Sequence, residues 1–464
     1  MFEITDNQLN ELISLGLSHG GDWCDLYFER TTYQDLILRD SQVSAGGFSL
    51  DCGCGIRVLK SDKTGYAYSE SLDYNSLSNA AKAASEIADG SRCNGRELCV
   101  CTRKAPSRYD QKETWQDSKA SNFIPWITGL EQEIRSRDQR VEKVIISLAY
   151  STSEIMMFNS LGEKTSDFRP LGTVMATVLF CQNDRKETVN VSRSFRCGAE
   201  MLSESLIREL ADQATERLDD RFLAKRPKGG RMSVVMGAGA SGILLHEAMG
   251  HAFEADFNRK GQSVFSGKMG SRICKEGIDI IDDGTIFGNR GSINFDDEGV
   301  PSQKTYMVRD GILCSYLHDR ISAGYYGVEP TGNGRRESFR YHPIPRMRCT
   351  YMDSGNDGTV QNLISSVRKG VYVDEFSNGQ VKIGEGDFTF YVKRGYMIEN
   401  GKLTFPVKDI NIIGNGPQAL SQISGVASDL KIDDGNWTCG KEQSVAVSCG
   451  TASVLVNNLT VGGE

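Results

Sequence analysis

The chain has 464 residues and a formal net charge of −8, with 39% hydrophobic and 25% charged residues. This length predicts two or three domains at roughly 150 residues each, and the composition is that of an ordinary globular protein. The mild acidity argues against the basic face that nucleic-acid binding needs, so no nucleic-acid partner is expected. Two counts stand out, 13 cysteines and five histidines. If the chemistry of the protein uses histidine, only these five positions can supply it.

The N-terminus lacks the basic start and apolar run of a signal peptide, and no stretch is long and apolar enough for a transmembrane helix. The odd number of cysteines, spread along a long chain, does not resemble a secreted disulfide framework. We therefore expect a cytoplasmic protein with mostly reduced thiols and no membrane partner. Cys52 and Cys54, like Cys99 and Cys101, are closer in sequence than the usual zinc pair, and we interpret them as incidental.

The first half of the chain alternates helical and β-like segments. Apolar residues at helical spacing predict a helix over 7–16, and an alanine-rich segment predicts another over 75–89. Later helices are expected at 122–137 and 199–220. Short apolar runs predict strands at 24–29, 35–38, 55–60, 142–150, 172–181 and 187–194. The polar segment 90–118 is expected to be an irregular surface loop.

The second half changes character after a basic Pro/Gly-rich stretch at 224–231. This stretch is the candidate domain boundary, which gives an N-terminal α/β domain over 1–225 and a β-rich C-terminal domain over 231–464. One long helix is expected near 241–256. Asp310-Gly311 and Asn400-Gly401 are hairpin signals. Strands are expected at 304–309, 380–383, 387–392 and 403–407. The predicted class is α+β.

A glycine motif, Gly237-Ala-Gly239-Ala-Ser-Gly242, follows a strand-like run and precedes the predicted helix. With Asp256 about twenty residues on, it resembles a dinucleotide-binding fingerprint. Against that interpretation, Asp256 falls in the same helix, and no second βαβ unit follows. The alternative is a tight turn in which the glycines let the backbone pass close to a neighbour.

A second motif in the same segment is His246-Glu247-Ala-Met-Gly-His251. Zinc binds neutral imidazole, and a glutamate beside the ligands can act as a general base. In the familiar H-E-x-x-H form both histidines lie on one helical face. Here one extra residue would turn the rings apart by about 140°. The spacing therefore predicts a local irregularity near Gly250, either a π-bulge or a bend. Two helix histidines without a metal are the alternative.

A catalytic zinc site also needs a third protein ligand. Glu254 is three residues beyond His251, where it could bind metal or orient a histidine. A cysteine thiolate is a strong zinc ligand, and Lys441 would favour that charge state of Cys439. The residues alone leave five candidates: Glu254, Asp256, His318, His342 and Cys439.

The chain resembles the TldD/PmbA family over nearly its whole length. Several segments carry the resemblance in order: LLHEAMGHAFEADFN (244–258), DDEGVP (296–301), PTGNGRRES (330–338), GQVKIGEGDF (379–388), CGKEQS (439–444) and NNLTVGG (457–463). The partner-type subunit of this family lacks H-E-x-x-x-H, so the intact motif resembles the TldD-type metallopeptidase subunit. The resemblance implies one zinc ion held by His246, His251 and Cys439, with Glu247 as the catalytic base. It also implies small, unfolded or extended peptide substrates, and a dimer with a partner-type subunit or with itself.

The sequence also offers candidates for substrate binding and two alternative functions. Arg335, Arg336 and Glu337 are candidates for gripping peptide termini or carbonyls, with a structural ion-pair cluster as the alternative. For the whole protein, the rivals are a non-catalytic peptide-binding scaffold with a structural metal, and a thiol hydrolase with Cys439 as nucleophile.

Overall fold

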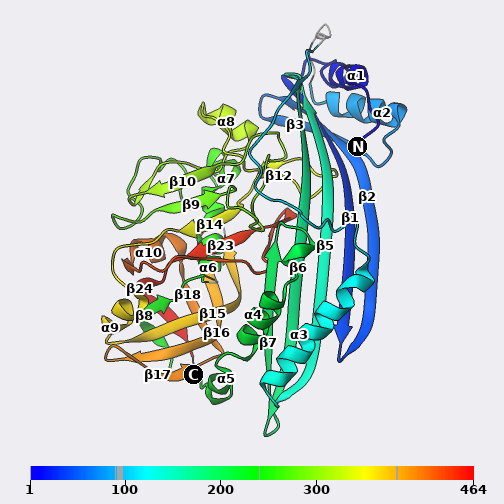
Figure 1. Cartoon of the computed structure of the whole chain (residues 1–464). Coiled ribbons are helices and arrows are strands. Elements are labelled where there is room, and N and C mark those ends of the chain that lie inside the picture. The colour runs from blue at the N-terminus through cyan, green and yellow to red at the C-terminus, as the bar shows by residue number, and fades with distance from the viewer. Residues whose placement is uncertain (1, 89, 91–97, 240, 383–384, 464) are drawn as a thin grey trace.

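The computed structural model describes residues 2–88, 90, 98–239, 241–382 and 385–463. A curved sheet of long strands forms the N-terminal half, and a more compact arrangement of shorter strands forms the C-terminal half beside it (Figure 1). The mixture of helices and strands confirms the predicted α+β class. Among the helices that the structure describes, none is long and apolar enough to cross a membrane.

The N-terminal sheet has the strand order β3-β2-β1-β5-β6-β4, with β7 paired to β6. Its strands are β1 (Trp23–Arg39), β2 (Gln42–Lys60), β3 (Lys63–Ser69), β4 (Cys101–Thr102), β5 (Val141–Asn159), β6 (Glu163–Gln182) and β7 (Arg185–Phe195). The accompanying helices and 3-10 turns are α1 (Asp6–Gly16), α2 (Tyr74–Ser85), η1 (Ala120–Phe123), α3 (Ile124–Arg137), η2 (Ala199–Met201), α4 (Glu204–Thr215) and α5 (Leu218–Leu223).

Two predicted elements of this half differ in the structure. The strands expected at 24–29 and 35–38 are one strand, β1, because the residues between them pair with both β2 and β5. The helix expected over 199–220 is divided, because Arg217 adopts a left-handed φ of 51° between α4 and α5. Residues 89 and 91–97, within the predicted helix end and surface loop, lie outside the described residues.

The two faces of the N-terminal sheet have different neighbours. One face packs against α1 and α2 at one end and against α3 and α4 at the other, forming two apolar clusters. On the opposite face, Tyr27, Ile155 and Met157 contact Phe295 and Phe339 of the C-terminal half. Successive residues of a strand point to opposite faces, so β1 and β5 support both the helices and the contact between the halves.

The C-terminal half contains two larger sheets. One has the order β11-β10-β9-β14-β23-β20; in the other, β15 pairs with both β8 and β16, so that β15, β8, β24, β18 and β16 close on themselves. The strands are β8 (Gly230–Met236), β9 (Ile280–Asp283), β10 (Lys304–Arg309), β11 (Ile312–Leu313), β12 (Gly334–Arg335), β13 (Ile344–Pro345), β14 (Cys349–Met352), β15 (Lys369–Lys382), β16 (Asp387–Glu399), β17 (Lys402–Val407), β18 (Ile410–Asn415), β19 (Ile423–Val426), β20 (Lys431–Asp433), β21 (Thr438–Lys441), β22 (Gln443–Ala446), β23 (Ser448–Thr451) and β24 (Val454–Gly462).

The helices of this half are short: α6 (Gly242–Ala248), η3 (Gly250–Phe253), α7 (Ala255–Arg259), α8 (Arg320–Tyr326), α9 (Val360–Ser365) and α10 (Gly416–Ser421). Helix α6 contacts β14 and β23 of one large sheet and β15 and β16 of the other. Its side chains belong to the largest apolar core of the molecule. The predicted hairpin at Asp310-Gly311 joins β10 to β11, with φ values of 50° and 75° that suit a tight turn.

Strands β1 to β7 and strands β8 to β24 pair within separate sheets. The boundary predicted at 224–231 stays a proposal that agrees with this division. Buried ion pairs join the two halves. Arg57 contacts Asp25 of its own sheet at 2.6 Å and Glu298 of the C-terminal half at 2.7 Å, and Arg169 contacts Asp297 at 2.6 Å.

Replacing Arg57 with methionine is expected to reduce the free energy of unfolding by about 3–5 kcal/mol, because buried Glu298 loses its cation and buried Asp25 keeps only Arg336, at 3.5 Å. Asp25 and Glu298 have nearly inaccessible side chains. Urea denaturation measures the change. The matched control is Arg103→Met, which removes an exposed pair with Glu163 and should cost about 1 kcal/mol or less. Equal effects of the two substitutions would contradict a role for the buried pairs in joining the halves.

Candidate active site

The segment predicted as one long helix at 241–256 is broken into α6, η3 and α7. Met249 leaves helical geometry with φ of −134°, and Glu254 is extended with φ of −69° and ψ of 127°. The extended backbone at Glu254 is held by another segment of the protein, since Leu317 exchanges backbone hydrogen bonds with Phe253 and Ala255. The irregularity therefore occurs where the histidine spacing predicts it, but as a break with a 3-10 turn rather than a π-bulge.

The break brings the two motif histidines together. His246 lies in α6 and His251 in η3, and their ring centroids are 5.3 Å apart. Gly250 permits this geometry, because a Cβ there would lie 2.2 Å from the sulfur of Met347. Both histidines are buried, with exposed fractions of 1% and 4%. The extra residue of the motif is thus accommodated by ending the helix between its two histidines.

Cys439 approaches the histidines from β21, in the hairpin that β21 forms with β22. Its sulfur lies 3.3 Å from Nε2 of His251. One potential ligand atom from each of His246, His251 and Cys439 lies within 4.8 Å of the others, and all three residues are buried. Among the described residues, no other group of three or more histidine, cysteine or carboxylate side chains lies close enough together to hold a metal ion.

Glu254 and Lys441 stand behind His251. Oε2 of Glu254 lies 2.8 Å from Nδ1 of His251 and accepts a hydrogen bond of 3.0 Å from Nζ of Lys441. Lys441 also contacts Asp256 at 2.8 Å. A carboxylate on Nδ1 directs Nε2 of the same ring toward Cys439. The position of Glu254 suits the second of the two roles considered for it, orienting a histidine, and this role stays a prediction.

Neighbouring groups strongly shift the pKa values of Cys439, His251 and Glu254. Burial raises the pKa of Cys439, but the neighbouring His246 and His251 outweigh this effect and lower the pKa to about 4. Burial lowers the pKa of His251, but Glu254 and Cys439 outweigh it and raise the pKa to about 10. For Glu254, burial is outweighed by Lys441 and His251, and the pKa falls to about 2. The cluster therefore favours a thiolate, the form of cysteine that binds metal.

The donor set fits a zinc ion. Both ring nitrogens of His246 are buried and have no hydrogen-bond partner among the described residues. A buried polar atom without a partner is costly, and a metal ion would supply the missing interaction. Two imidazoles and one thiolate are ligands that zinc accepts, and three protein ligands leave the open position of a catalytic site.

Glu247 follows His246 in α6 and is half-buried. No described residue forms a hydrogen bond or ion pair with its carboxylate. Its predicted role as the catalytic base stays a prediction.

The other candidate ligands lie in different surroundings. His318 packs against Tyr316 and Tyr326, and His342 lies beside Tyr66. Asp256 is paired with Lys441. None of these three belongs to the group around Cys439.

Arg335, Arg336 and Glu337 have protein partners. Arg335 donates to the carbonyls of Met347 and Ala446, and Arg336 donates to the carbonyl of Asp297 at 2.9 Å. The carboxylate of Glu337 accepts from the backbone N–H of Ser444 at 2.6 Å. Both arginines are about 5% exposed. Their predicted contact with substrate stays a prediction.

The glycine motif serves close packing. Gly239 has a φ of 90°, and a Cβ on Gly242 would lie 2.5 Å from the backbone of Gly450. Asp256, which the nucleotide interpretation needed, is engaged by Lys441. Residue 240, inside the motif, lies outside the described residues.

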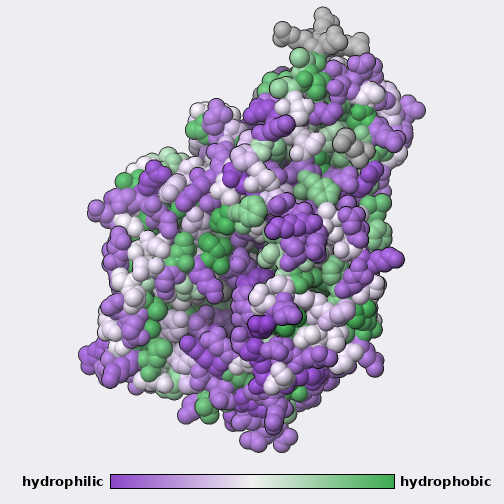
Figure 2. All heavy atoms as spheres, viewed as in Figure 1, coloured by the Kyte–Doolittle hydropathy of each residue, from purple (hydrophilic) through white to green (hydrophobic). Residues whose placement is uncertain are grey.

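A cleft of about 490 Å³ lies between the two halves of the molecule. One wall is formed by residues 189–193 of β7, and the other by parts of β15, β16 and the segment 431–437. Trp437 lines the cleft and packs against the small apolar cluster of Cys439, Val445 and Val447. Figure 2 shows this face hollowed between the halves, with mainly polar residues around the hollow. The cleft therefore lies at the junction of the halves, and none of His246, His251 and Cys439 lines it.

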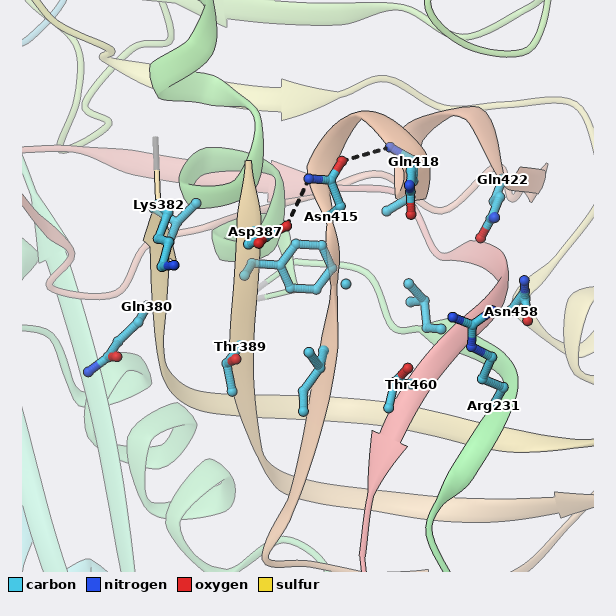
Figure 3. A pocket seen from close by; sticks show the side chains of 16 residues that line it. Arg231, Gln380, Lys382, Asp387, Thr389, Asn415, Gln418, Gln422, Asn458 and Thr460 are labelled. Atoms are coloured by element: carbon cyan, nitrogen blue, oxygen red, sulfur yellow. Dashed lines mark hydrogen bonds between the residues drawn. The ribbon is translucent and has the colours of Figure 1, made fainter. Parts of the chain in front are cut away.

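A second depression, of about 660 Å³, crosses the outer face of β15, β16, β18, β24 and β8 beside α10 (Figure 3). Its lining is mostly amide, hydroxyl and charged side chains, among them Gln380, Thr389, Thr460 and Arg231. None of the residues predicted for the metal site lies in it. We therefore place the candidate active site at the His246–His251–Cys439 cluster.

The buried arginines around Cys439 were missed by sequence reasoning. Arg290 and Arg346 donate to backbone carbonyls of the cysteine-bearing segment. No spacing or motif marks either residue, because their partners are backbone atoms more than 90 positions away.

Comparisons with known proteins identify the family of the chain. Residues 229–463 match the model of the PmbA/TldA metallopeptidase C-terminal domain, and residues 24–88 match that of PmbA/TldA metallopeptidase domain 1. A "Metalloprotease TldD homolog" of Haemophilus influenzae is 37% identical, covering 95% of this chain and 93% of the relative. A "Zinc metalloprotease TldD homolog" of Saccharolobus solfataricus is 26% identical, covering 96% and 97%.

Solved structures share the fold at low identity. A modulator of DNA gyrase from Thermotoga maritima superposes with a TM-score of 0.78 at 21% identity, covering 98% of this chain and all of the other. TldE from Thermococcus kodakarensis gives a TM-score of 0.74 at 17% identity, covering 98% and 100%. The chain therefore belongs to the TldD/PmbA family, and it is a metallopeptidase of that family.

Proposed function

We propose that the protein is a zinc-dependent peptidase that hydrolyses small, unfolded or extended peptides. His246, His251 and Cys439 would hold one zinc ion, and Glu247 would act as the catalytic base. One observation carries the proposal: the imidazoles of His246 and His251 and the thiol of Cys439 lie close together in the interior, although Cys439 is 188 positions from His251. The relative named a zinc metalloprotease supports the choice of metal.

When bound, zinc would supply a Lewis acid that polarises the peptide carbonyl and makes water more acidic. The chain's own residues supply the rest of the chemistry. Glu247 accepts a proton from the attacking water and then donates it to the leaving amine. Glu254 holds the ring of His251 through Nδ1, and Lys441 keeps Glu254 ionised. Burial of His246, His251 and Cys439 limits the access of bulk water to the cluster.

The cleft between the halves supports the choice of an extended substrate. Side chains of consecutive strand residues point to alternate faces, so the five consecutive residues 189–193 can line one cleft only through the strand edge. Beyond them, the N–H of Ser194 already donates to Asp434 at 2.6 Å. An extended peptide could add to the remaining edge of β7 by backbone hydrogen bonding. We propose that substrate enters there.

We propose that the protein works as a dimer, with a partner-type subunit or with a second copy of itself. The fold shared with TldE of Thermococcus kodakarensis supports this, since one fold serves both subunit types. The cytoplasmic location inferred from the sequence stays a prediction.

Removing the metal tests the function directly. Dialysis against a chelator is expected to abolish peptide hydrolysis, and one equivalent of zinc should restore it, because the Lewis acid is lost and regained. Peptidase assays with metal analysis measure both. If activity needs a partner subunit, the assay is run on the complex. A thiol hydrolase would survive chelation, and a scaffold would bind peptide without cleaving it, so either result would overturn the proposal.

A further inference from the structure

The hairpin that carries Cys439 has an unusual setting. Its strands, β21 and β22, form a sheet of their own, and no other described strand pairs with either. An isolated two-stranded hairpin is only marginally stable in water. A catalytic metal site nevertheless requires its ligands to be held accurately. Some other group must therefore support the backbone of this hairpin.

Arg346 provides much of that support from a fully buried position. Its guanidinium donates to three carbonyls of the hairpin, those of Cys439 at 2.7 Å, Lys441 at 3.0 Å and Gln443 at 2.6 Å. These contacts span both strands and the turn between them. A planar guanidinium with several fixed donors can bridge carbonyls in this way, whereas a lysine ammonium is a single point of charge.

Two further buried arginines hold the ends of the segment. Arg335 donates to the carbonyl of Ala446 at 2.6 Å, at the end of β22. Arg290 donates to the carbonyl of Trp437 at 2.9 Å, just before β21. Five carbonyls between positions 437 and 446 are thus engaged by three guanidiniums.

Arg290 also connects the hairpin to the N-terminal half. Its guanidinium donates to the hydroxyls of Ser194 in β7 at 2.6 Å and Thr173 in β6 at 3.2 Å. The same side chain therefore contacts both the N-terminal sheet and the residues preceding Cys439. The position of the hairpin depends in this way on how the two halves pack.

The charges of these arginines are weakly compensated. Arg290 and Arg335 form no ion pair with any residue that the structure describes, and Nε of Arg346 is 4.0 Å from Glu254. Burial lowers the pKa of Arg290 to about 10. Burying a cation without a close carboxylate is costly. Stability alone is therefore a poor explanation for three such residues around one hairpin.

We propose that Arg290, Arg335 and Arg346 are positioning residues of the metal site. Their guanidiniums replace the neighbouring strands that the hairpin lacks, and so they hold Cys439 against the two histidines. The inference rests on the proposed function in taking Cys439 as a zinc ligand.

Lysine substitutions test it, because they keep the charge and remove the planar fork. In Arg346→Lys the zinc affinity is expected to fall by about 10–100-fold, which is the usual effect of removing a residue that supports a metal ligand without binding the metal itself. With cobalt in place of zinc, the thiolate-to-cobalt absorption band is expected to weaken or shift. In metal-free protein, amides 438–446 should exchange with solvent faster than in the unsubstituted protein.

Arg348→Lys is the matched control. Arg348 is also fully buried, but its guanidinium donates to the carbonyl of Gly332 and to none in the hairpin. This variant is expected to lose stability while keeping the zinc affinity and cobalt spectrum of the unsubstituted protein. Arg290→Lys serves as a second test, and it carries the measurement if Arg346→Lys does not fold.

The proposal is overturned if the folded Arg346→Lys and Arg290→Lys proteins keep full zinc affinity and an unchanged cobalt band. It is also overturned if Arg348→Lys loses zinc to the same extent. Failure of the proposed ligand set is recognised separately, because Cys439→Ala would then keep its zinc. Loss of zinc in Cys439→Ala, with full retention in the arginine variants, refutes the positioning role alone.

Discussion

Replacing Glu247 with glutamine is expected to lower kcat by about 10²–10⁴-fold, the usual contribution of a general base. The amide keeps the size of the side chain but cannot accept a proton. Glu247 has no described hydrogen-bond or ion-pair partner, so the substitution should leave the fold unchanged. Zinc content should also stay the same, because the three proposed ligands are untouched. Peptidase assays and metal analysis on the same preparation measure both quantities.

The control for this experiment is Glu276→Gln, which alters an exposed glutamate in the same half of the chain. That variant should keep full activity. Full activity in Glu247→Gln with zinc retained would remove Glu247 as the base. Loss of zinc together with activity would instead assign the residue to metal binding.

Replacing Cys439 with alanine is expected to lower the zinc affinity by more than the roughly 10–100-fold that is typical when a residue supporting a metal ligand is removed. One of three proposed ligands disappears, and with it the negative charge that offsets the metal. Activity should fall to background. Metal analysis, zinc titration and the peptidase assay measure these changes.

The matched control is Cys274→Ala, because Cys274 is also a buried free cysteine, with an exposed fraction of 5%, but lies outside the metal cluster. It should keep zinc and activity. Retention of zinc by Cys439→Ala would contradict the proposed ligand set. Activity lost without loss of zinc would favour Cys439 as a nucleophile.

Local sequence patterns predicted the elements whose stability is local. The helix expected over 7–16 corresponds to α1, where Thr5 caps the first turn through its side chain. The hairpin turn at Asp310-Gly311 follows from residues that tolerate positive φ. Strand lengths were underestimated, as in β1, because pairing with neighbours on both sides extends a strand through polar residues. Helix 199–220 was overextended, since a single left-handed residue, Arg217, interrupts it.

The candidate site also has a part that local sequence patterns predicted and a part that they did not. The spacing of His246 and His251 marked a possible metal pair and the need for an irregular backbone, because six neighbouring residues determine both. Only the family resemblance selected Cys439 among five candidate ligands, since its one local mark, Lys441 two residues later, is too common a neighbour to identify a metal ligand. The extended backbone at Glu254, which separates η3 from α7, depends on Leu317, because this residue distant in sequence binds the backbone on both sides of Glu254.

By itself, then, the sequence determined the α+β class, the histidine pair with its adjacent glutamate, and the membership that pointed to a metallopeptidase. Tertiary structure alone decided which side chains support that site. Lys441 behind Glu254, the arginines around the β21–β22 hairpin and the cleft beside β7 all depend on contacts between segments far apart in the chain. Periodicity and motif spacing report interactions over a few residues. Packing of segments that are distant in sequence, most of them within the C-terminal half, brings Lys441 and the arginines to the His246–His251–Cys439 cluster.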